Sequence, residues 1–393
     1  MWSRERISVC AYFAILGLVC SAWVSSIDHI KELLGLDEGQ LGWLLFCGPL
    51  GNLVSFTFAS AFVARFGSRR SVILATWAYL ASAAALTACF FTGAPVVLWG
   101  LSIAFFGGAG NVVNISINAQ AGLVEKRAGR QIMSSFHAVF SLMMFGGSLF
   151  TLLTTSLDLP VSYRMLETVG AALALHVTAA FGLPEDDRAA APAAASANRC
   201  WHRPDLPLVA MGFAALIIMG CEASICDWVC VFFHDALHAS EAQAKWGLCG
   251  VTGMMAFARF LGDGLVNRFT PTRVMRLDSL LVASGLALAL AVPFMDLAPL
   301  PALLVSLAGY AVAGFGIAGM IPILYSRVNR TQAMPPASAL TFVGSMGFFG
   351  YFFGPPIIGH VAKATNLSIG LSIFAVLILA LLPLRFDASA KRT

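Results

Sequence analysis

The sequence predicts an all-α membrane protein whose twelve transmembrane helices form two pseudo-symmetric six-helix bundles. Three observations support this prediction: a very apolar composition, twelve apolar stretches of spanning length, and a one-sided distribution of basic residues. Of the 393 residues, 59% are hydrophobic and only 11% are charged, whereas a soluble domain carries about 25% charged residues. The formal net charge of +4 is too small to indicate a nucleic-acid partner, so the lipid bilayer is the expected surroundings.

Each transmembrane helix needs about 20 apolar residues. The first apolar stretch, residues 7–27, resembles a secretory signal, but its run is too long and no clean cleavage site follows it. We therefore interpret it as a membrane helix that is retained. The other predicted spans are 40–64, 71–91, 95–123, 131–155, 162–182, 206–233, 243–265, 273–293, 300–326, 336–361 and 366–385.

One long polar segment interrupts this series. It reads "PEDDRAAAPAAASANRCWHRPD" at residues 184–205 and is charged and low in complexity. Such a composition is typical of a flexible linker. The sequence therefore predicts an N-terminal bundle over 1–183, a cytoplasmic linker over 184–205 and a C-terminal bundle over 206–393.

The basic residues test the number of spans. With the N-terminus in the cytoplasm, the cytoplasmic helix ends collect Arg4, Arg6, Arg65, Arg69, Arg70, Lys126, Arg127, Arg130, Arg188, Arg199, Arg203, Arg268, Arg273, Arg276, Arg327, Arg330, Arg385, Lys391 and Arg392. The opposite side keeps Lys31, Arg164, Lys245 and Lys363, and Arg259 falls within a span. This bias satisfies the positive-inside rule, favours an even number of helices and places both termini in the cytoplasm.

Several functional classes receive no support from the sequence. No nucleotide-binding P-loop, nucleophile elbow or zinc-hydrolase pattern is present, so we expect neither an enzyme nor a protein driven directly by ATP. The nine cysteines form no CxxC pair. Cys226 and Cys230 share a helix face, but no Met-x-x-Met or Cys–His cluster accompanies them, so we predict no metal site and no cofactor.

The two halves repeat each other. "ARFGSRRSVIL" (64–74) follows the second span, and "NRFTPTRVMRL" (267–277) follows the eighth, so that Arg65-Phe66 aligns with Arg268-Phe269. Parallel repeats of this kind are typical of transporters that bind their solute near the middle of the bilayer.

These motifs resemble the major facilitator superfamily, whose members carry a pattern close to G-x-x-x-D-R-x-G-R-R between helices 2 and 3. In "SAFVARFGSRR" the matching residues are Arg65, Gly67, Arg69 and Arg70, whereas Ser60 and Ala64 replace the glycine and the acid. The resemblance implies a gating role for these arginines and for Arg268. Because the acid is missing, we expect gating to depend more on the second half.

More narrowly, the chain is similar to a bacterial branch related to the fucose permeases. The matching stretches are "LGLDEGQLGWLL" (34–45), "NAQAGLVEKRAGRQIMSSFHAVFSL" (118–142), "EASICDW" (222–228) and "FGPPIIG" (353–359). The resemblance implies a multi-pass transporter of the bacterial cytoplasmic (inner) membrane, for which a monomer suffices.

Amides gather in the fourth span, in "GGAGNVVNISINAQAG" (107–122). At 100° per residue, Asn111, Asn114 and Asn118 fall within about 60° of arc, while Gln120 points the opposite way. Three amides on one stripe are costly against lipid, so they face the bundle or a watery cavity. We predict that they bind a polar solute; the alternative is that they hold helices together.

Two acids lie in the seventh span. Glu222 is near mid-depth, and Asp227 lies closer to the outside, about 140° around the helix. We predict that Glu222 is the proton-coupling site and that Asp227, grouped with it in proton coupling, guards the outer entrance. The alternative is a structural hydrogen bond or ion pair that holds a broken helix. Arg259 and Asp263 stand one turn apart in the eighth span and are predicted to form a gating pair.

His137 is a third candidate for proton coupling, although a packing histidine is an equal alternative. Tyr12 and Tyr351 are the aromatic residues expected to bind solute, because helices of those positions line the cavity in the resembled superfamily. "YFFGPPIIGH" (351–360) predicts a Gly-Pro break in the eleventh span.

The predicted function is proton-coupled uptake of a small polar solute such as a sugar. The main rival is proton-driven export of a drug or metabolite; the drug antiporters of this superfamily usually carry G-P-x-x-G-G in helix 5, where this chain reads "SLMMFGGSLF". A third possibility, a membrane sensor that binds a solute without moving it, is disfavoured by cytoplasmic loops too short for an output domain.

Overall fold

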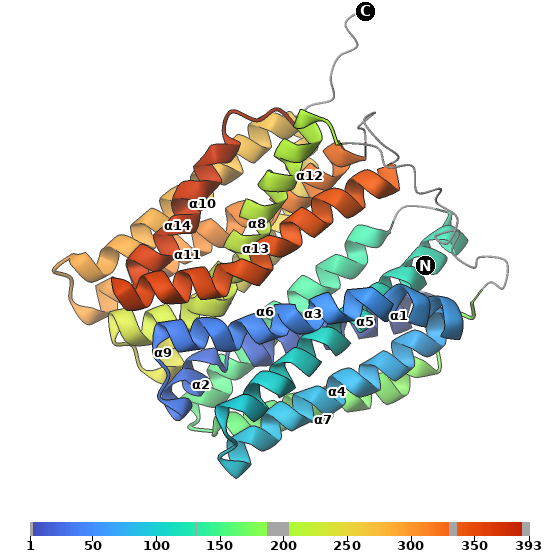
Figure 1. Ribbon diagram of the computed structural model, residues 1–393, viewed down its shortest axis with the longest axis horizontal. Coiled ribbons are helices and arrows are strands. Elements are labelled where there is room, and N and C mark those ends of the chain that lie inside the picture. The colour runs from blue at the N-terminus through green and yellow to red at the C-terminus, as the bar shows by residue number, and fades with distance from the viewer. Residues whose placement is uncertain (1–2, 130–131, 187–203, 330–335, 387–393) are drawn as a thin grey trace, which may run out of the picture. The chain divides into compact units, whose positions relative to one another are not determined.

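A computed structural model describes residues 3–129, 132–186, 204–329 and 336–386, and almost all of them are helical (Figure 1). The helices are α1 (Arg4–Val24), α2 (Ile27–Leu34), α3 (Glu38–Phe66), α4 (Ser68–Thr92), α5 (Val96–Ala128), α6 (Met133–Ser156), α7 (Val161–Ala180), α8 (Leu206–Val231), α9 (Glu241–Arg268), α10 (Pro271–Ala291), α11 (Pro299–Ile317), α12 (Met320–Val328), α13 (Pro336–Ala364) and α14 (Leu367–Leu377). Short turns continue α8, α10 and α14 as η2 (Phe232–Ala236), η3 (Val292–Phe294) and η4 (Ile378–Leu381). Eleven of the predicted spans each correspond to one helix, with or without its short continuation, and the tenth corresponds to α11 and α12 together, so the twelve-helix fold is confirmed.

The chain forms two compact units: unit 1 comprises Met1–His29 and Leu44–Arg199, and unit 2 comprises Ile30–Trp43 and Cys200–Thr393. In unit 1, α1 packs against α6 and α7, and α4 packs against α5. In unit 2, α8 packs against α13, α10 against α11, and α11 against α9 (Figure 1). Residues 187–203 of the predicted linker lie outside the described residues.

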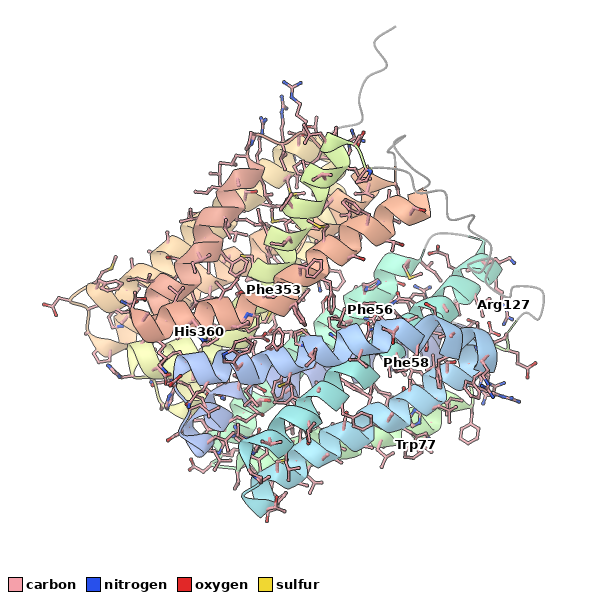
Figure 2. All side chains as sticks on the ribbon, viewed as in Figure 1. Phe56, Phe58, Trp77, Arg127, Phe353 and His360 are labelled. Carbon is pink, nitrogen blue, oxygen red and sulfur yellow. The ribbon has the colours of Figure 1, made fainter. Side chains whose placement is uncertain are left out.

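Apolar side chains cover the outer surfaces of the helices. Nine segments of the described chain are long and apolar enough to cross a membrane. Phe58, Trp77 and Phe353, all labelled in Figure 2, are close to half exposed. Exposed aromatic side chains along such segments suit contact with lipid, while the backbone polar groups are satisfied within each helix.

Two helices, α3 and α9, begin with the same capping arrangement. Asp37 accepts from Gln40 N at 2.8 Å, and Gln40 Oε1 accepts from Asp37 N at 3.0 Å, before α3. Ser240 and Gln243 form the equivalent reciprocal pair before α9, at 3.3 and 3.0 Å. Each box satisfies backbone donors that the first helical turn leaves unpaired. The hydrogen bond from Gln40 and the nearby Lys363 also hold the pKa of Asp37 below its ordinary value.

The repeat seen in the sequence also appears as a repeated contact at the opposite ends of these two helices. The Arg65 guanidinium lies 5.6 Å from the ring centre of Phe66, and that of Arg268 lies 5.8 Å from Phe269. A cation over an aromatic face is weakly favourable at exposed sites. The aligned Arg-Phe pairs therefore adopt the same local geometry.

Glycines bring α3 and α5 into very close contact. A Cβ atom on Gly51 would lie 2.6 Å from the carbonyl carbon of Ala104, and one on Gly107 would lie 2.8 Å from that of Gly48. No side chain fits at such separations, so these positions require glycine. The glycines that open residues 107–122 thus pack α5 onto α3.

Helix breaks differ from those expected. The tenth span is divided between α11 and α12 at Ala318 and Gly319, where Pro322 lacks the N–H that an unbroken helix would direct to the Ala318 carbonyl. The predicted break in the eleventh span is wrong, since α13 continues through Pro355 and Pro356. Both prolines are buried, so the packing of α13 holds the helix together despite the missing donors.

Candidate functional site

The amide stripe on α5 divides into two parts. The Asn111 side chain donates to Ser55 Oγ of α3 at 2.7 Å, and Ser55 is buried. This bond joins two helices, which is the structural alternative considered for these amides. Asn111 therefore has a packing contact in this conformation.

Asn114 and Asn118 form the accessible part of the stripe. Asn114 is exposed and Asn118 is half-buried. Asn118 Nδ2 donates to Asn114 Oδ1 at 2.9 Å and to the Asn114 carbonyl at 2.8 Å. Among the described residues, neither the Asn114 NH₂ group nor Asn118 Oδ1 has a partner. The pair thus presents a free donor beside a free acceptor, which matches a hydroxyl group.

Gln120 lies on the buried side of α5 and belongs to a polar cluster at one end of unit 1. Its Nε2 atom donates to Ser68 Oγ at 2.7 Å. Asp186, which follows α7, accepts from Ser68 N at 2.9 Å and from Arg69 N, and also from the Ser68 hydroxyl. Gly67 adopts φ 79° beside this carboxylate. Asp186 thus caps the N-terminus of α4. It lies beside the connection from α3 to α4, where the family pattern would place an acid at position 64 and this chain has Ala64.

Arg127 connects the same cluster to α1 and to the segment that follows α7. It lies at the end of α5 (Figure 2), where Nη1 pairs with Glu5 at 2.6 Å and Nη2 donates to the Glu185 carbonyl at 2.8 Å. Arg69 pairs with the Glu185 carboxylate at 3.4 Å. Sequence reasoning missed Asp186 because its partners lie more than a hundred residues away.

Replacement of Asp186 by alanine should remove the cap of α4. We expect a loss of about 1–2 kcal/mol, and hence a melting temperature lower by about 2–8 °C. Glu185→Gln is the matched control, because Glu185 is largely exposed and its single ion pair contributes less than about 1 kcal/mol. Fluorescence-monitored thermal unfolding of the purified protein distinguishes the two; equal melting temperatures for both variants would contradict the capping role.

The acids of α8 have different surroundings. Glu222 Oε1 pairs with Arg259 Nη2 of α9 at 3.3 Å, and both side chains are about three-quarters buried. The sequence suggested Asp263 as the partner of Arg259, but the Asp263 side chain lies outside the described residues. Asp227 is half-buried and has no hydrogen bond or ion pair among the described residues.

Glu222 belongs to an accessible stripe on an otherwise buried helix face. Met219, Glu222 and Cys226 are half-buried, at helical spacings of three and four residues. Their neighbours Cys221, Ala223 and Ile225 are buried. The described part of α8 therefore has an accessible carboxylate and an accessible thiol on the same stripe.

The remaining predicted residues, His137, Tyr12 and Tyr351, differ in how far their side chains are exposed. His137 is exposed on α6, with its ring 5.1 Å from Phe13. Tyr12 is fully buried in unit 1, 5.6 Å from the His176 ring. Tyr351 is half-buried on α13. Tyr12 thus offers no accessible surface in this conformation, whereas His137 and Tyr351 do.

The predicted gating arginines lie at helix ends. Arg65 and Arg268 stand over their neighbouring phenylalanines, Arg69 pairs with Glu185, and Arg70 is exposed. Arg65, Arg69 and Arg70 thus stand where α3 gives way to α4, and Arg268 where α9 gives way to α10.

Unit 2 contains an ion cluster on the predicted outer side. Lys31 Nζ lies 2.9 Å from Glu38 and 2.5 Å from Asp235, and Asp235 also contacts His234 Nδ1 at 2.8 Å. Lys363 pairs with Asp37 at 2.9 Å. The sequence offered Lys31 only as an isolated outer charge, since its partner in η2 is 204 residues away.

Comparison with known proteins supports a transport family. The model of the Major Facilitator Superfamily matches residues 7–355. An uncharacterised MFS-type transporter of Yersinia pestis is 27% identical over 382 residues, covering 95% of this chain and 93% of that protein. The membrane protein MosC of Rhizobium meliloti is 27% identical over 366 residues, covering 92% and 84%.

Solved structures share the fold. The nucleoside transporter NupG superposes with a TM-score of 0.74 at 13% identity, covering 96% of this chain and 97% of that chain. A D-xylose-proton symporter superposes with a TM-score of 0.73 at 14% identity, covering 98% of each chain. The family match, the relatives and the two bundles of apolar helices agree, so this chain belongs to the major facilitator superfamily of membrane transporters and is not an enzyme.

Proposed function

We propose that the protein moves a small hydroxylated solute, a sugar or sugar-like metabolite, across the bacterial inner membrane by alternating access, in symport with protons. Both termini are cytoplasmic in this proposal, and a single chain suffices. The observation that carries it is the exposed Asn114–Asn118 pair on a membrane-spanning helix. An exposed amide on such a helix is costly against lipid and suits a water-lined surface.

The chemistry of this pair favours a hydroxyl-bearing solute. Its free NH₂ group donates and its free oxygen accepts, while a hydroxyl group does both. No cationic side chain shares the stripe, so the pair gives no reason to expect an anionic solute. The sugar and nucleoside transporters named among the structural neighbours carry solutes rich in hydroxyl groups, which agrees with this choice. Asn111 is the third proposed binding residue of this stripe, and Tyr12 joins it only if α1 moves. In unit 2, Tyr351 is proposed separately to contact the solute.

Proton coupling is assigned to unit 2. Glu222 faces an accessible stripe and pairs with Arg259, so protonation of its carboxyl breaks this ion pair. Such a change of pairing can bias a two-state helix arrangement. Asp227 is an accessible titratable group of unit 2 that is proposed to take part in this coupling. His137, which is exposed in unit 1, is proposed to exchange protons within its own unit. The arginines at the cytoplasmic helix ends and Arg259 with Asp263 are proposed to act in gating.

The test uses purified protein in liposomes that contain a pH-sensitive dye. Pentoses, hexoses, sugar acids and nucleosides are added outside, with Glu222→Gln measured in parallel. Acidification of the interior by one solute, absent in the variant, establishes proton symport and identifies the solute class. If no solute acidifies the interior in either insertion orientation, symport of these solutes is wrong and proton-driven export becomes the function to test.

Replacement of Asn114 by alanine should weaken solute binding about 10-fold, because the solute loses one hydrogen bond of about 1.4 kcal/mol. Ser116→Ala is the matched control: Ser116 is buried two residues along the same helix, on its opposite face, and donates to the Val112 carbonyl. Binding is measured by isothermal calorimetry with the solute found above. Equal affinities for the two variants would exclude Asn114 from the binding surface.

A further inference from the structure

A second buried acid lies in unit 2, away from Glu222. Asp278 of α10 is only 5% exposed. Within the described part of the chain, it has neither a hydrogen bond nor an ion pair. An ionised carboxylate is strongly disfavoured in such a place, and a carboxyl group there is neutral instead.

The carboxyl group faces the break between α11 and α12. A Cβ atom on Gly319 would lie 3.5 Å from Asp278 Oδ2, and one on Gly316 would lie 2.7 Å from the Asp278 carbonyl. At this break, Pro322 cannot donate to the Ala318 carbonyl. A protonated carboxyl group is a hydrogen-bond donor and an ionised one is not. A protonated Asp278 therefore brings a hydrogen-bond donor to the side of the break, which an ionised Asp278 does not.

The elements packed against α10 supply no compensating charge within ion-pair distance among the described side chains. α14, η3 and η4 carry no titratable residue, and α11 carries only Tyr310. The titratable or charged residues on the other neighbours and on α10 itself are Tyr325 and Arg327 of α12, Glu241, Lys245, Cys249, Arg259, Asp263 and Arg268 of α9, Arg273 and Arg276 of α10, and Arg385 beyond η4. The side chain of Asp263 is not described, and Arg276 donates to the Leu382 carbonyl at 2.8 Å.

We propose that Asp278 is a proton-binding site whose protonation holds α12 at its break with α11. The site lies seven residues into α10, about 10 Å along the helix from its cytoplasmic end. When the break opens, the O–H bond of the carboxyl group dissociates and the proton passes to cytoplasmic water. The carboxylate that remains is then hydrated rather than buried.

The position of α12 gives this site a route to the rest of unit 2. α12 packs against α8 and α13, and α8 carries Glu222. A change at the break therefore moves a helix that touches the Glu222 helix. This site requires no particular solute, and it goes beyond the proposed coupling at Glu222.

The test measures backbone hydrogen exchange in α12 by mass spectrometry on the full chain in nanodiscs, at pH 6 and pH 9. After correction for intrinsic rates, the wild-type protein should exchange at least 10-fold faster at pH 9, because Asp278 is then ionised. Asp278→Asn mimics the protonated form and should exchange slowly at both values. Asp296→Asn, which removes an exposed acid from the η3–α11 connection, should behave as wild type.

Infrared spectroscopy provides a second readout that also needs no solute. The C=O stretching band of a protonated carboxylic acid should be present at pH 7 and reduced in Asp278→Asn but not in Asp296→Asn. If Asp278→Asn does not fold, Asp278→Glu keeps the carboxyl group and should retain the pH-dependent exchange. An identical band in wild type and Asp278→Asn, or exchange in α12 without pH dependence, would overturn the proposal whether or not proton symport is found.

Discussion

Arg259→Met should destabilise the protein by about 3 kcal/mol and stop transport, and adding Glu222→Gln should recover most of the stability. The guanidinium is the described partner of Glu222, at 3.3 Å, and both groups are about three-quarters buried. Removing one member of a buried pair leaves the other charge uncompensated, which costs about 3–5 kcal/mol. Because this pair is partly exposed, we expect a loss of stability at the lower end of this range.

A double-mutant cycle measures the pair directly. The single variants, the double variant and wild type are unfolded thermally, and the interaction free energy is the departure from additivity. Arg268→Met is the control, because Arg268 is an exposed arginine on the same helix and contacts only the Phe269 ring among the described residues. It should change stability by less than about 0.5 kcal/mol. If the Arg259 and Glu222 effects simply add, the two residues do not depend on each other.

Measurements of solute exchange and of solute accumulation distinguish the structural role of the Glu222–Arg259 pair from its role in proton coupling. Glu222→Gln keeps the shape of the side chain but cannot lose a proton, so solute exchange across the membrane should persist while accumulation against a gradient disappears. Arg259→Met should lose both activities. Accumulation by Glu222→Gln would show that the proton is carried elsewhere in the protein.

The fold was predictable because membrane helices are specified locally. A run of about 20 apolar residues forms its hydrogen bonds within itself, so each span is determined by its own composition. The alignment of Arg65-Phe66 with Arg268-Phe269 likewise reflects local sequence, and the structure shows the same contact twice. The break at Gly319 was not predicted, because a proline such as Pro322 does not by itself indicate where a helix breaks. Pro355 and Pro356, for example, lie within an unbroken helix.

Partners of polar residues were less predictable because they come from distant segments. Helical spacing favoured Asp263 as the partner of Arg259, and the Asp263 side chain lies outside the described residues. The carboxylate described beside Arg259 belongs to Glu222 of another helix, which spacing along one helix could not indicate. Asn111 was grouped with Asn114 by its angle on the helix, yet the nearby Ser55 gives it a packing contact. Asp278 was overlooked because an acid near the end of a membrane helix is ordinarily solvated. Only packing shows that it is buried.

Gly51→Ala should be the most damaging of the small substitutions in unit 1. The added Cβ atom would lie 2.6 Å from the Ala104 carbonyl carbon and closer still to its oxygen. Both atoms belong to the backbone of α5, so no side-chain rotation relieves the overlap. Forcing extra atoms into a packed interface costs about 1–3 kcal/mol and sometimes more; the rigidity of two facing backbones places this case at or above 3 kcal/mol.

Gly122→Ala provides the matched control on α5. No atom lies within 4 Å of the position where its Cβ would be built, and alanine favours a helix over glycine by up to about 1 kcal/mol. The same chemical change should therefore be neutral or stabilising at Gly122 and strongly destabilising at Gly51, as measured by the yield of monodisperse protein and by thermal unfolding. If the two variants unfold at the same temperature, the close contact of α3 with α5 is not required. If only Gly51→Ala lowers the yield or the melting temperature, the close glycine contacts set the separation of α3 and α5. At this separation the Asn111 amide reaches Ser55.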